Sequence, residues 1–187
     1  MSDLNLTLFQ WLAAGTPPAR PALWLATAFA LGGAWLSAGI IGVAIWKKAA
    51  DRAYLWIVLA AAGPCAMLSH AIALRLDQPR PFVLGLAQAY IEHAGRGSLP
   101  STHASVMFLV AVACLLRPSL RRVGLALLAS AIVTGWARIY VGVHFPIDIA
   151  AGLVLGAVLA GALAIALRLA RRLLPAEGAA PATWRMP

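Results

Sequence analysis

The sequence predicts an all-α fold, a polytopic membrane bundle of about five transmembrane helices with an N-terminal interfacial helix. Of the 187 residues, 62% are hydrophobic and only 11% are charged, whereas soluble domains have about 25% charged residues. Long apolar runs separated by short basic clusters fill most of the chain. A single membrane domain over residues 1–174 follows, and the tail at 175–187 is expected to be disordered.

The helices are expected in the following order. Residues 4–14 are too short to cross a bilayer, which takes about 20 apolar residues, and are predicted to lie in the interface. Three longer apolar runs are predicted to span, at about 22–46, 54–76 and 145–167. Two shorter or interrupted runs complete the bundle, at about 102–116 and 123–141. The last span contains two pairs of small residues typical of close helix packing, Gly152 with Gly156 and Ala157 with Gly161.

Basic residues predict the orientation of this bundle. With five spans, ten of the 15 Lys and Arg residues fall on one side, and the positive-inside rule makes that side and the C-terminus cytoplasmic. The other five fall on the outer side, where basic residues are disfavoured: Arg20, Arg75, Arg80, Arg96 and Arg138. The net charge of +9 thus follows from topology. Because the charges form no single basic face, no nucleic acid is expected as a partner.

Three segments of the predicted outer side contain the most unusual polar residues. They are DQPRPF at 77–82, SLPSTHAS at 98–105 and ARIYVGVHFPIDIAAG at 137–152. The five-span topology brings them to one face although they are far apart in sequence. Ionisable residues at membrane depth are costly and are usually functional, so this face is the predicted site.

The residue types in these segments suit phosphoryl transfer. Arg80 and Arg138 supply planar, permanently charged groups that bind phosphate oxygens in pairs. His103 lies in the first turn of a predicted helix. Asp148 follows His144 by four residues, so its carboxylate can hold one ring nitrogen of His144 and leave the other as a nucleophile. Such a set requires no metal.

Each of these residues also has a structural explanation. Ser101 alone is better explained as the N-cap of a helix than as a catalytic group. Asp148 alone could complement a helix dipole. His70, in the middle of a span, is interpreted as structural. His93 is equally compatible with a structural role and with substrate contact.

The segments together resemble the signature of the type 2 phosphatidic acid phosphatase (PAP2) superfamily, which also includes the vanadium haloperoxidases. That signature is Lys-x6-Arg-Pro, then Pro-Ser-Gly-His, then Ser-Arg-x5-His-x3-Asp. The matching residues are Arg80-Pro81, Pro100-Ser101-Thr102-His103, and Arg138 with His144 and Asp148. The short chain and the pattern from His93 to Ala104 look most like the bacterial undecaprenyl pyrophosphate phosphatases.

The resemblance implies a role for each matching residue. His144, oriented by Asp148, would attack phosphorus, and His103 would protonate the leaving oxygen and then activate water. The candidate substrate-binding residues are Arg80, Ser101, Arg138, Thr102, Arg75 and His93. Neither a metal nor another cofactor is expected.

The chain departs from the signature at three positions. Ala73 stands where the family has Lys, Thr102 where it has Gly, and Ala137 where it has Ser. Arg75 is no simple replacement for the lysine, because two residues turn a helix by about 200°. These departures concern the phosphate-binding residues and leave the two histidines in place.

The activity implied by the resemblance is removal of one phosphate from undecaprenyl pyrophosphate, the lipid carrier of cell-wall synthesis. It would occur through a phosphohistidine, at the outer face of the bacterial inner membrane. A phosphatidylglycerophosphate, phosphatidic acid or lipid A phosphatase, or a lipid phosphotransferase, would need the same headgroup chemistry. An anion transporter is less favoured because the chain has no internal repeat, and a haloperoxidase is disfavoured because those enzymes are soluble. The expected partners are a lipid phosphate and the bilayer, and the oligomeric state is left open.

Overall fold

The structure is a computed structural model that describes residues 2–173, and in that range it contains only helices, turns and loops. The α-helices are α1 (Asp3–Leu12), α2 (Arg20–Lys47), α3 (Arg52–Leu76), α4 (Thr102–Leu115), α5 (Arg121–Tyr140) and α6 (Pro146–Leu173). Two short 3-10 helices, η1 (Ala49–Asp51) and η2 (Pro118–Leu120), precede α3 and α5. The predicted all-α bundle is therefore confirmed. The tail at 175–187 lies outside the described residues.

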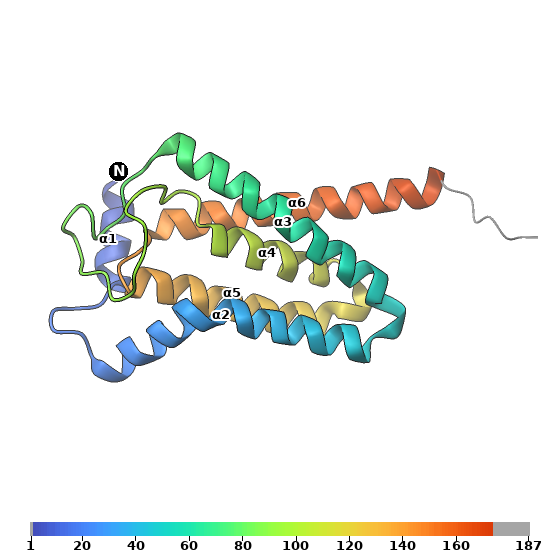
Figure 1. Ribbon diagram of the computed structural model, residues 1–187, viewed down its shortest axis with the longest axis horizontal. Helices are drawn as coiled ribbons and strands as arrows, with labels where there is room; N and C mark the ends of the chain where they lie inside the picture. The colour runs from blue at the N-terminus through green and yellow to red at the C-terminus, as the bar shows by residue number, and fades with distance from the viewer. Residues whose placement is uncertain (1, 174–187) are drawn as a thin grey trace, which may run out of the picture.

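Helices α2 to α6 run back and forth, so the bundle has two ends (Figure 1). One end contains α1, the long loop 77–101 and the short connection from α5 to α6; we call it the site end. The opposite end contains the connections from α2 to α3 and from α4 to α5. We call it the basic end, because basic residues lie in these connections and in the adjoining helix ends: Lys47, Lys48, Arg52, Arg117, Arg121 and Arg122.

The long helices have the length and composition of membrane spans, and α4 differs from them. Four helical segments are long and apolar enough to cross a membrane, those that contain α2, α3, α5 and α6. Helix α4 has 14 residues, which is about 21 Å against a hydrocarbon core of about 30 Å. It packs against α3, α5 and α6, and nine of its residues are buried. The span expected at about 102–116 is thus the short central helix of the bundle.

Small residues of α6 allow its close approach to α4. A Cβ added to Gly152 would lie 2.7 Å from the Cβ of Ala104, and one added to Gly156 would lie 2.4 Å from the carbonyl oxygen of Ser105. The first predicted pair of small residues is therefore confirmed as a helix contact. The second pair is wrong, because a Cβ added to Gly161 would meet nothing within 4 Å. Gly161 faces away from the core, whereas its neighbour Ala160 is buried in one cluster with residues of α4.

Helix α1 is the expected short N-terminal helix, and it is anchored to the site end. Phe9 is buried, and its ring centroid lies 5.1 Å from that of Phe145. Asn5 is also buried, and its Oδ1 accepts a hydrogen bond from the backbone N–H of Ile147 at 3.1 Å. That N–H group lies in the first turn of α6, so it has no acceptor within its own helix. Helix α1 therefore supports the segment that precedes Asp148.

Candidate active site

The three polar segments predicted to share one face meet at the site end. They surround a cavity of about 300 Å³ between α3, α4, the loop 77–101 and the connection from α5 to α6. All four histidines of the chain line it. The lining residues are His70, Leu74, Arg80, His93, Ala94, Arg96, Gly97, Pro100, Thr102, His103, Arg138 and His144.

The tight connection between α5 and α6 positions His144. Gly142 has φ +79°, and a Cβ there would lie 2.5 Å from the carbonyl oxygen of Gln88, so glycine is required at this turn. The backbone N–H groups of Val143 and His144 then donate to the carbonyl oxygen of Arg138, at 3.2 and 3.3 Å. This turn brings the His144 ring back beside the end of α5.

Asp148 fixes the orientation of the His144 ring. Its Oδ2 lies 3.2 Å from Nδ1 of His144 and accepts hydrogen bonds from the Phe145 N–H at 2.8 Å and from the Ser98 hydroxyl. Asp148 is completely buried. Because a carboxylate oxygen accepts, Nδ1 carries the proton and Nε2 retains its lone pair. This is the tautomer that a nucleophilic histidine requires.

Arg80 is held close to the other nitrogen of that ring. Its Nη1 lies 3.0 Å from Nε2 of His144 and donates to the carbonyl oxygen of Val143 at 2.7 Å. Its Nη2 donates to the carbonyl oxygen of Gly97 at 3.2 Å. The guanidinium therefore joins the loop 77–101 to the connection that contains His144.

Arg138 makes a similar set of contacts on the other side of the cavity. Its Nη1 donates to the carbonyl oxygen of Ala30 at 3.2 Å, and its Nη2 donates to Nε2 of His93 at 2.7 Å. The His93 ring in turn meets the His144 ring edge to face, with centroids 5.8 Å apart. The predicted site residues Arg138, His93 and His144 are thus in one cluster.

Neither buried arginine has a carboxylate partner. Arg80 and Arg138 are 4% and 2% exposed, and the described residues place no Asp or Glu oxygen within 4.0 Å of either guanidinium. The Nε atoms of both also have no hydrogen-bond partner among residues 2–173. Buried charges are normally paired and buried donors normally bonded. Two buried guanidinium groups in this state have the charge and the free donors to hold an anion.

Burial and the two guanidinium groups keep the neighbouring histidines neutral. Burial, with Arg138 and Arg80 nearby, lowers the pKa of His144 well below its usual value. Burial, with Arg80 and Arg138, lowers the pKa of His93 to about 4. Burial also lowers the pKa of Arg80. At neutral pH both rings keep a lone pair, and the positive charge of the cluster is on the arginines.

The residues of the Pro-Ser-Thr-His segment lie at the start of α4. Ser101 is the N-cap, but its side chain makes no capping hydrogen bond; its buried Oγ has no partner among the described residues. Its N–H donates to the carbonyl oxygen of Asp148 at 3.0 Å. Thr102 and His103 line the cavity, and the Thr102 hydroxyl accepts from that of Ser69 at 3.3 Å. The Ser101 hydroxyl is therefore available to a ligand.

Ala73, which stands where the family has lysine, and the nearby Arg75 differ in their surroundings from the other candidate residues. Arg75 is exposed and is not among the residues that line the cavity. Ala73 is buried, and a Cβ added to Gly97 would lie 3.6 Å from its Cβ. The loop 77–101 therefore packs directly on position 73.

Sequence reasoning missed two residues of this site. Ser98 is buried and donates to Asp148. It lies in the polar segment 98–105, but no spacing in the sequence predicted a hydrogen-bond partner for it. His70 was interpreted as structural, yet it lines the cavity from α3. It lies three residues before Ala73, which is close to one helical turn, and that spacing could have indicated it. Within residues 2–173 no group of three or more His, Cys, Asp or Glu is arranged to hold a metal ion.

Comparison with known proteins assigns the family. The model of the PAP2 superfamily matches residues 53–172, a range that contains every residue that lines the cavity. The chain belongs to the PAP2 superfamily. The signature predicted from the sequence is thereby confirmed, and this PAP2 protein is a membrane phosphatase.

Two curated relatives of this PAP2 chain are bacterial. It is 30% identical over 156 residues to YbjG of Escherichia coli strain K12, whose name proposes an undecaprenyl-diphosphatase; the match covers 82% of this chain and 78% of that protein. It is 35% identical over 89 residues to the undecaprenyl-diphosphatase BcrC of Bacillus subtilis strain 168, covering 48% and 45% of the two chains. With its membrane helices, this PAP2 chain is a bacterial membrane protein.

Two solved structures have the same PAP2 fold. LpxE of Aquifex aeolicus matches with a TM-score of 0.71 and 23% identity, over 89% of this chain and 96% of that one. A PAP2-type phosphatidylglycerolphosphate phosphatase of Bacillus subtilis matches with a TM-score of 0.66 and 19% identity, over 91% and 88%. At these identities the likeness concerns the fold.

Proposed function

We propose that this PAP2 phosphatase removes the terminal phosphate of undecaprenyl pyrophosphate through a phosphohistidine at His144. The observation that carries the proposal is the pair of buried guanidinium groups without a carboxylate partner, Arg80 and Arg138, beside an oriented neutral histidine. A phosphoryl group supplies the missing negative charge, and its oxygens suit the unpaired donors.

In the first step, Nε2 of His144 attacks the terminal phosphorus, and the bond from phosphorus to the bridging oxygen breaks. His103 protonates that oxygen, and the lipid monophosphate leaves. Asp148 stabilises the positive charge that develops on the His144 ring, because its Oδ2 faces Nδ1. In the second step a water molecule attacks the phosphohistidine, His103 accepts its proton, and orthophosphate is released.

The phosphoryl oxygens are held by groups that are unpaired in the structure. The Nε atoms of Arg80 and Arg138 and the hydroxyl of Ser101 are buried without partners among the described residues. Arg80 Nη1 lies 3.0 Å from Nε2 of His144 in the structure. A bound phosphate accepts the hydrogen bond of this Nη1 instead, and Nε2 is then free to act as the nucleophile. Donors fixed before the reaction stabilise charge in the transition state without reorganisation.

His70 is our candidate for the hydrogen-bond donor that the family lysine would supply. It lines the cavity from α3, and the residue before it, Ser69, is hydrogen-bonded to Thr102, the residue before the proposed acid His103. The bridging oxygen and the second phosphate of a pyrophosphate must lie opposite His144 during in-line attack. His70 can donate a hydrogen bond there, which a monophosphate ester would not use. Thr102, whose hydroxyl accepts a hydrogen bond from that of Ser69, also lines the cavity.

The choice of lipid is supported by the two relatives named for undecaprenyl-diphosphatase activity. We further propose that the cavity faces the outside of the bacterial inner membrane. The positive-inside rule supports this orientation, because the basic end has most of the Lys and Arg residues of the connecting turns.

Phosphate release from purified protein tests the proposal. The substrates are undecaprenyl pyrophosphate, phosphatidylglycerophosphate, phosphatidic acid and a lipid A phosphate, each at matched detergent mole fraction and with chelator present. We expect undecaprenyl pyrophosphate to have the highest kcat/KM and His144→Ala to lower it by about 10⁴-fold or more. A matched control is Met67→Ala, since Met67 is 75% exposed on α3 and does not line the cavity.

The other outcomes of this assay are equally informative. A preference for another lipid would contradict the proposed substrate but would leave the proposed mechanism unchanged. Activity that persists in both His103→Ala and His144→Ala would overturn the mechanism. Absolute dependence on a divalent cation would contradict the proposed metal-free route.

A further inference from the structure

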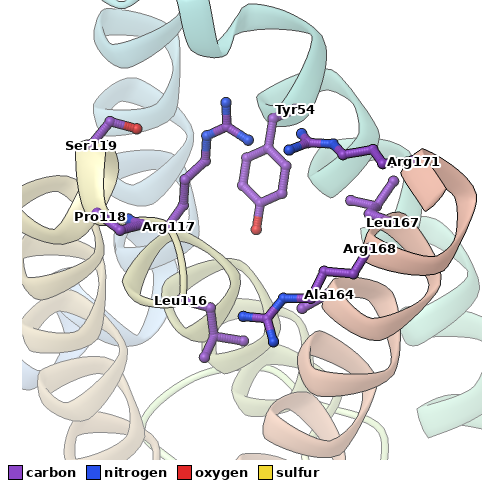
Figure 2. Close-up of a pocket in the computed structure, with 9 residues that line it drawn as sticks. All are labelled: Tyr54, Leu116, Arg117, Pro118, Ser119, Ala164, Leu167, Arg168 and Arg171. Carbon is purple, nitrogen blue, oxygen red and sulfur yellow. The ribbon is translucent and has the colours of Figure 1, made fainter. Parts of the chain in front are cut away.

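The basic end of the bundle contains a second polar hollow, far from the histidine cavity. It has a volume of about 440 Å³ and lies between α3, the connection from α4 to α5, and α6. Figure 2 shows three guanidinium groups around it, those of Arg117, Arg168 and Arg171, with Tyr54 between them. Nothing in the phosphatase mechanism uses these residues.

Tyr54 and Arg117 form a fixed wall of this hollow. The Tyr54 hydroxyl donates to the carbonyl oxygen of Ala113 at 2.6 Å, and the guanidinium carbon of Arg117 lies 4.7 Å from the Tyr54 ring centroid. Nε of Arg117 also donates to the buried carboxylate of Asp51. Both side chains are thus held in position before any ligand binds.

The other two arginines have no such compensation. Arg168 and Arg171 lie one turn apart on α6 and are exposed. Neither has a carboxylate within 4.0 Å among residues 2–173. Three guanidinium groups and one carboxylate leave a net charge of about +2 around the hollow, which would attract an anion.

A mostly apolar hollow adjoins the polar one. Its volume is about 450 Å³, and it shares Tyr54, Arg117, Leu167 and Arg171 with the first. Its remaining lining is Ala50, Ala53, Ile57 and Ala170. The two hollows therefore lie side by side at Tyr54, one basic and the other mostly apolar.

We propose that this double hollow binds one anionic phospholipid, with its phosphate between Arg168, Arg171 and Arg117 and an acyl chain along Ile57 and Ala170. Basic pockets between transmembrane helices suit anionic lipid headgroups. A free phosphate would use the guanidinium groups alone. The apolar half of the hollow is what favours a lipid, because an acyl chain there fills space beside exposed apolar residues such as Ile57, which is 40% exposed.

The test is thermal unfolding of the purified full-length chain in detergent. Dioleoyl-phosphatidylglycerol is the probe, because its phosphodiester has no terminal phosphate to hydrolyse. Dioleoyl-phosphatidylcholine and inorganic phosphate are titrated in parallel. The test variant is Arg168→Gln with Arg171→Gln. The control is Arg121→Gln with Arg172→Gln, which removes the same charge from exposed residues of the same end that line neither hollow.

We expect phosphatidylglycerol to raise the Tm of the wild type and of the control, with little effect from the other two probes. Removal of two cations should weaken apparent binding by roughly tenfold in the test variant. Without lipid, all variants should keep wild-type phosphatase activity, since the hollow is at the opposite end from the histidines. If the double variant is unstable, Arg168→Gln alone should give a smaller loss in the same direction.

Three results would overturn the proposal. The first is an equal rise in Tm for the test variant and the wild type. The second is an equal rise with phosphatidylcholine, which would indicate general lipid stabilisation. The third is an equal rise with inorganic phosphate and none beyond it with phosphatidylglycerol, which would make the hollow a site for soluble anions.

Discussion

At the scale of single residues, the site combines two permanent cations, Arg80 and Arg138, with two histidines that stay neutral, His93 and His144. Arg80 and Arg138 disfavour protonation of the rings beside them, and burial acts in the same direction. Among the described residues, Asp148 supplies the only carboxylate oxygen within 4.0 Å of a histidine nitrogen, and this oxygen is bonded by His144, Ser98 and Phe145. The arrangement favours a nucleophilic nitrogen over a histidine cation.

The lowered pKa of His93 predicts how stability depends on pH. The pKa of His93 is about 4 in the folded protein and about 6.5 in an unfolded chain. Between these values the unfolded state binds more protons, so the free energy of unfolding falls as the pH falls. Glutamine cannot titrate, but its amide oxygen can still accept from Arg138. We therefore expect His93→Gln to lose less Tm than the wild type between pH 7.5 and pH 5; identical losses would contradict the assigned titration.

The proposed role of His70 predicts a change in specificity. His70→Ala should lower kcat/KM for undecaprenyl pyrophosphate by about tenfold, the effect of losing one hydrogen bond to a charged group. Hydrolysis of phosphatidic acid should change by less than about twofold, because that substrate has no second phosphate. An equal loss with both substrates would mean that His70 supports the site without selecting the diphosphate. Met67→Ala should change neither.

Much of the site could be predicted from residue type and spacing, and the rest required the fold. Asp148 follows His144 by four residues, and this short spacing predicted their contact, although His144 lies just before α6. Arg80 and Arg138 follow from the family signature. Ser98 could not be found, because its contact with Asp148 depends on how the loop 77–101 returns over α6. The unpaired Ser101 hydroxyl was equally hidden, since sequence alone favours a capping bond that the structure lacks.

At the scale of the helices, the contact between α4 and α6 aligns the two catalytic candidates. Ser101 and His103 begin α4, Asp148 is in the first turn of α6, and the N–H of Ser101 donates to the carbonyl oxygen of Asp148. The glycines of α6 determine how closely these helix starts approach. Hydropathy predicted both helices and indicated that the run at about 102–116 is short, but it counted this run as one more span. Its central position follows from its burial on several sides, which a one-dimensional pattern does not contain.

Gly156 offers a direct test of this helix contact. In Gly156→Ala the new methyl group would meet the Ser105 carbonyl oxygen and the Leu109 backbone nitrogen, at 2.4 and 2.7 Å, so the helices must separate. We expect a loss of about 1–3 kcal/mol of unfolding free energy and a lower kcat, measured by denaturation in mixed micelles and by phosphate release. Gly161→Ala is the matched control on the same helix. It should be neutral or stabilising by up to about 1 kcal/mol, since its methyl group meets nothing; equal losses would contradict the packing.

At the scale of the whole molecule, the two ends of the bundle have different chemistry. The site end has the histidine cavity, and the basic end has the arginine hollow that we propose for an anionic lipid. In the proposed orientation, the basic end faces the cytoplasm, and the cavity at the opposite end therefore faces the outside. The lipid site would then anchor the bundle in the leaflet opposite to the one that supplies the substrate.

Cysteine labelling tests this orientation. Both natural cysteines, Cys65 and Cys114, are buried and can be replaced by alanine as a background. We expect Arg96→Cys to react with a membrane-impermeant maleimide added outside intact cells, and Arg121→Cys to react only after permeabilisation. Arg96 is exposed in the loop 77–101 and Arg121 is exposed at the basic end. The reverse pattern would place the cavity in the cytoplasm.

Trapping of the covalent intermediate is the most direct measurement of the central claim, the nucleophilic role of His144. Undecaprenyl pyrophosphate labelled with ³²P in the terminal phosphate is mixed with enzyme and quenched within milliseconds in alkali, which preserves phosphohistidine. We predict an acid-labile label on the peptide that contains His144, formed in wild type and in Met67→Ala and absent in His144→Ala. Label on another residue, or rapid hydrolysis by His144→Ala without any labelled protein, would contradict the account.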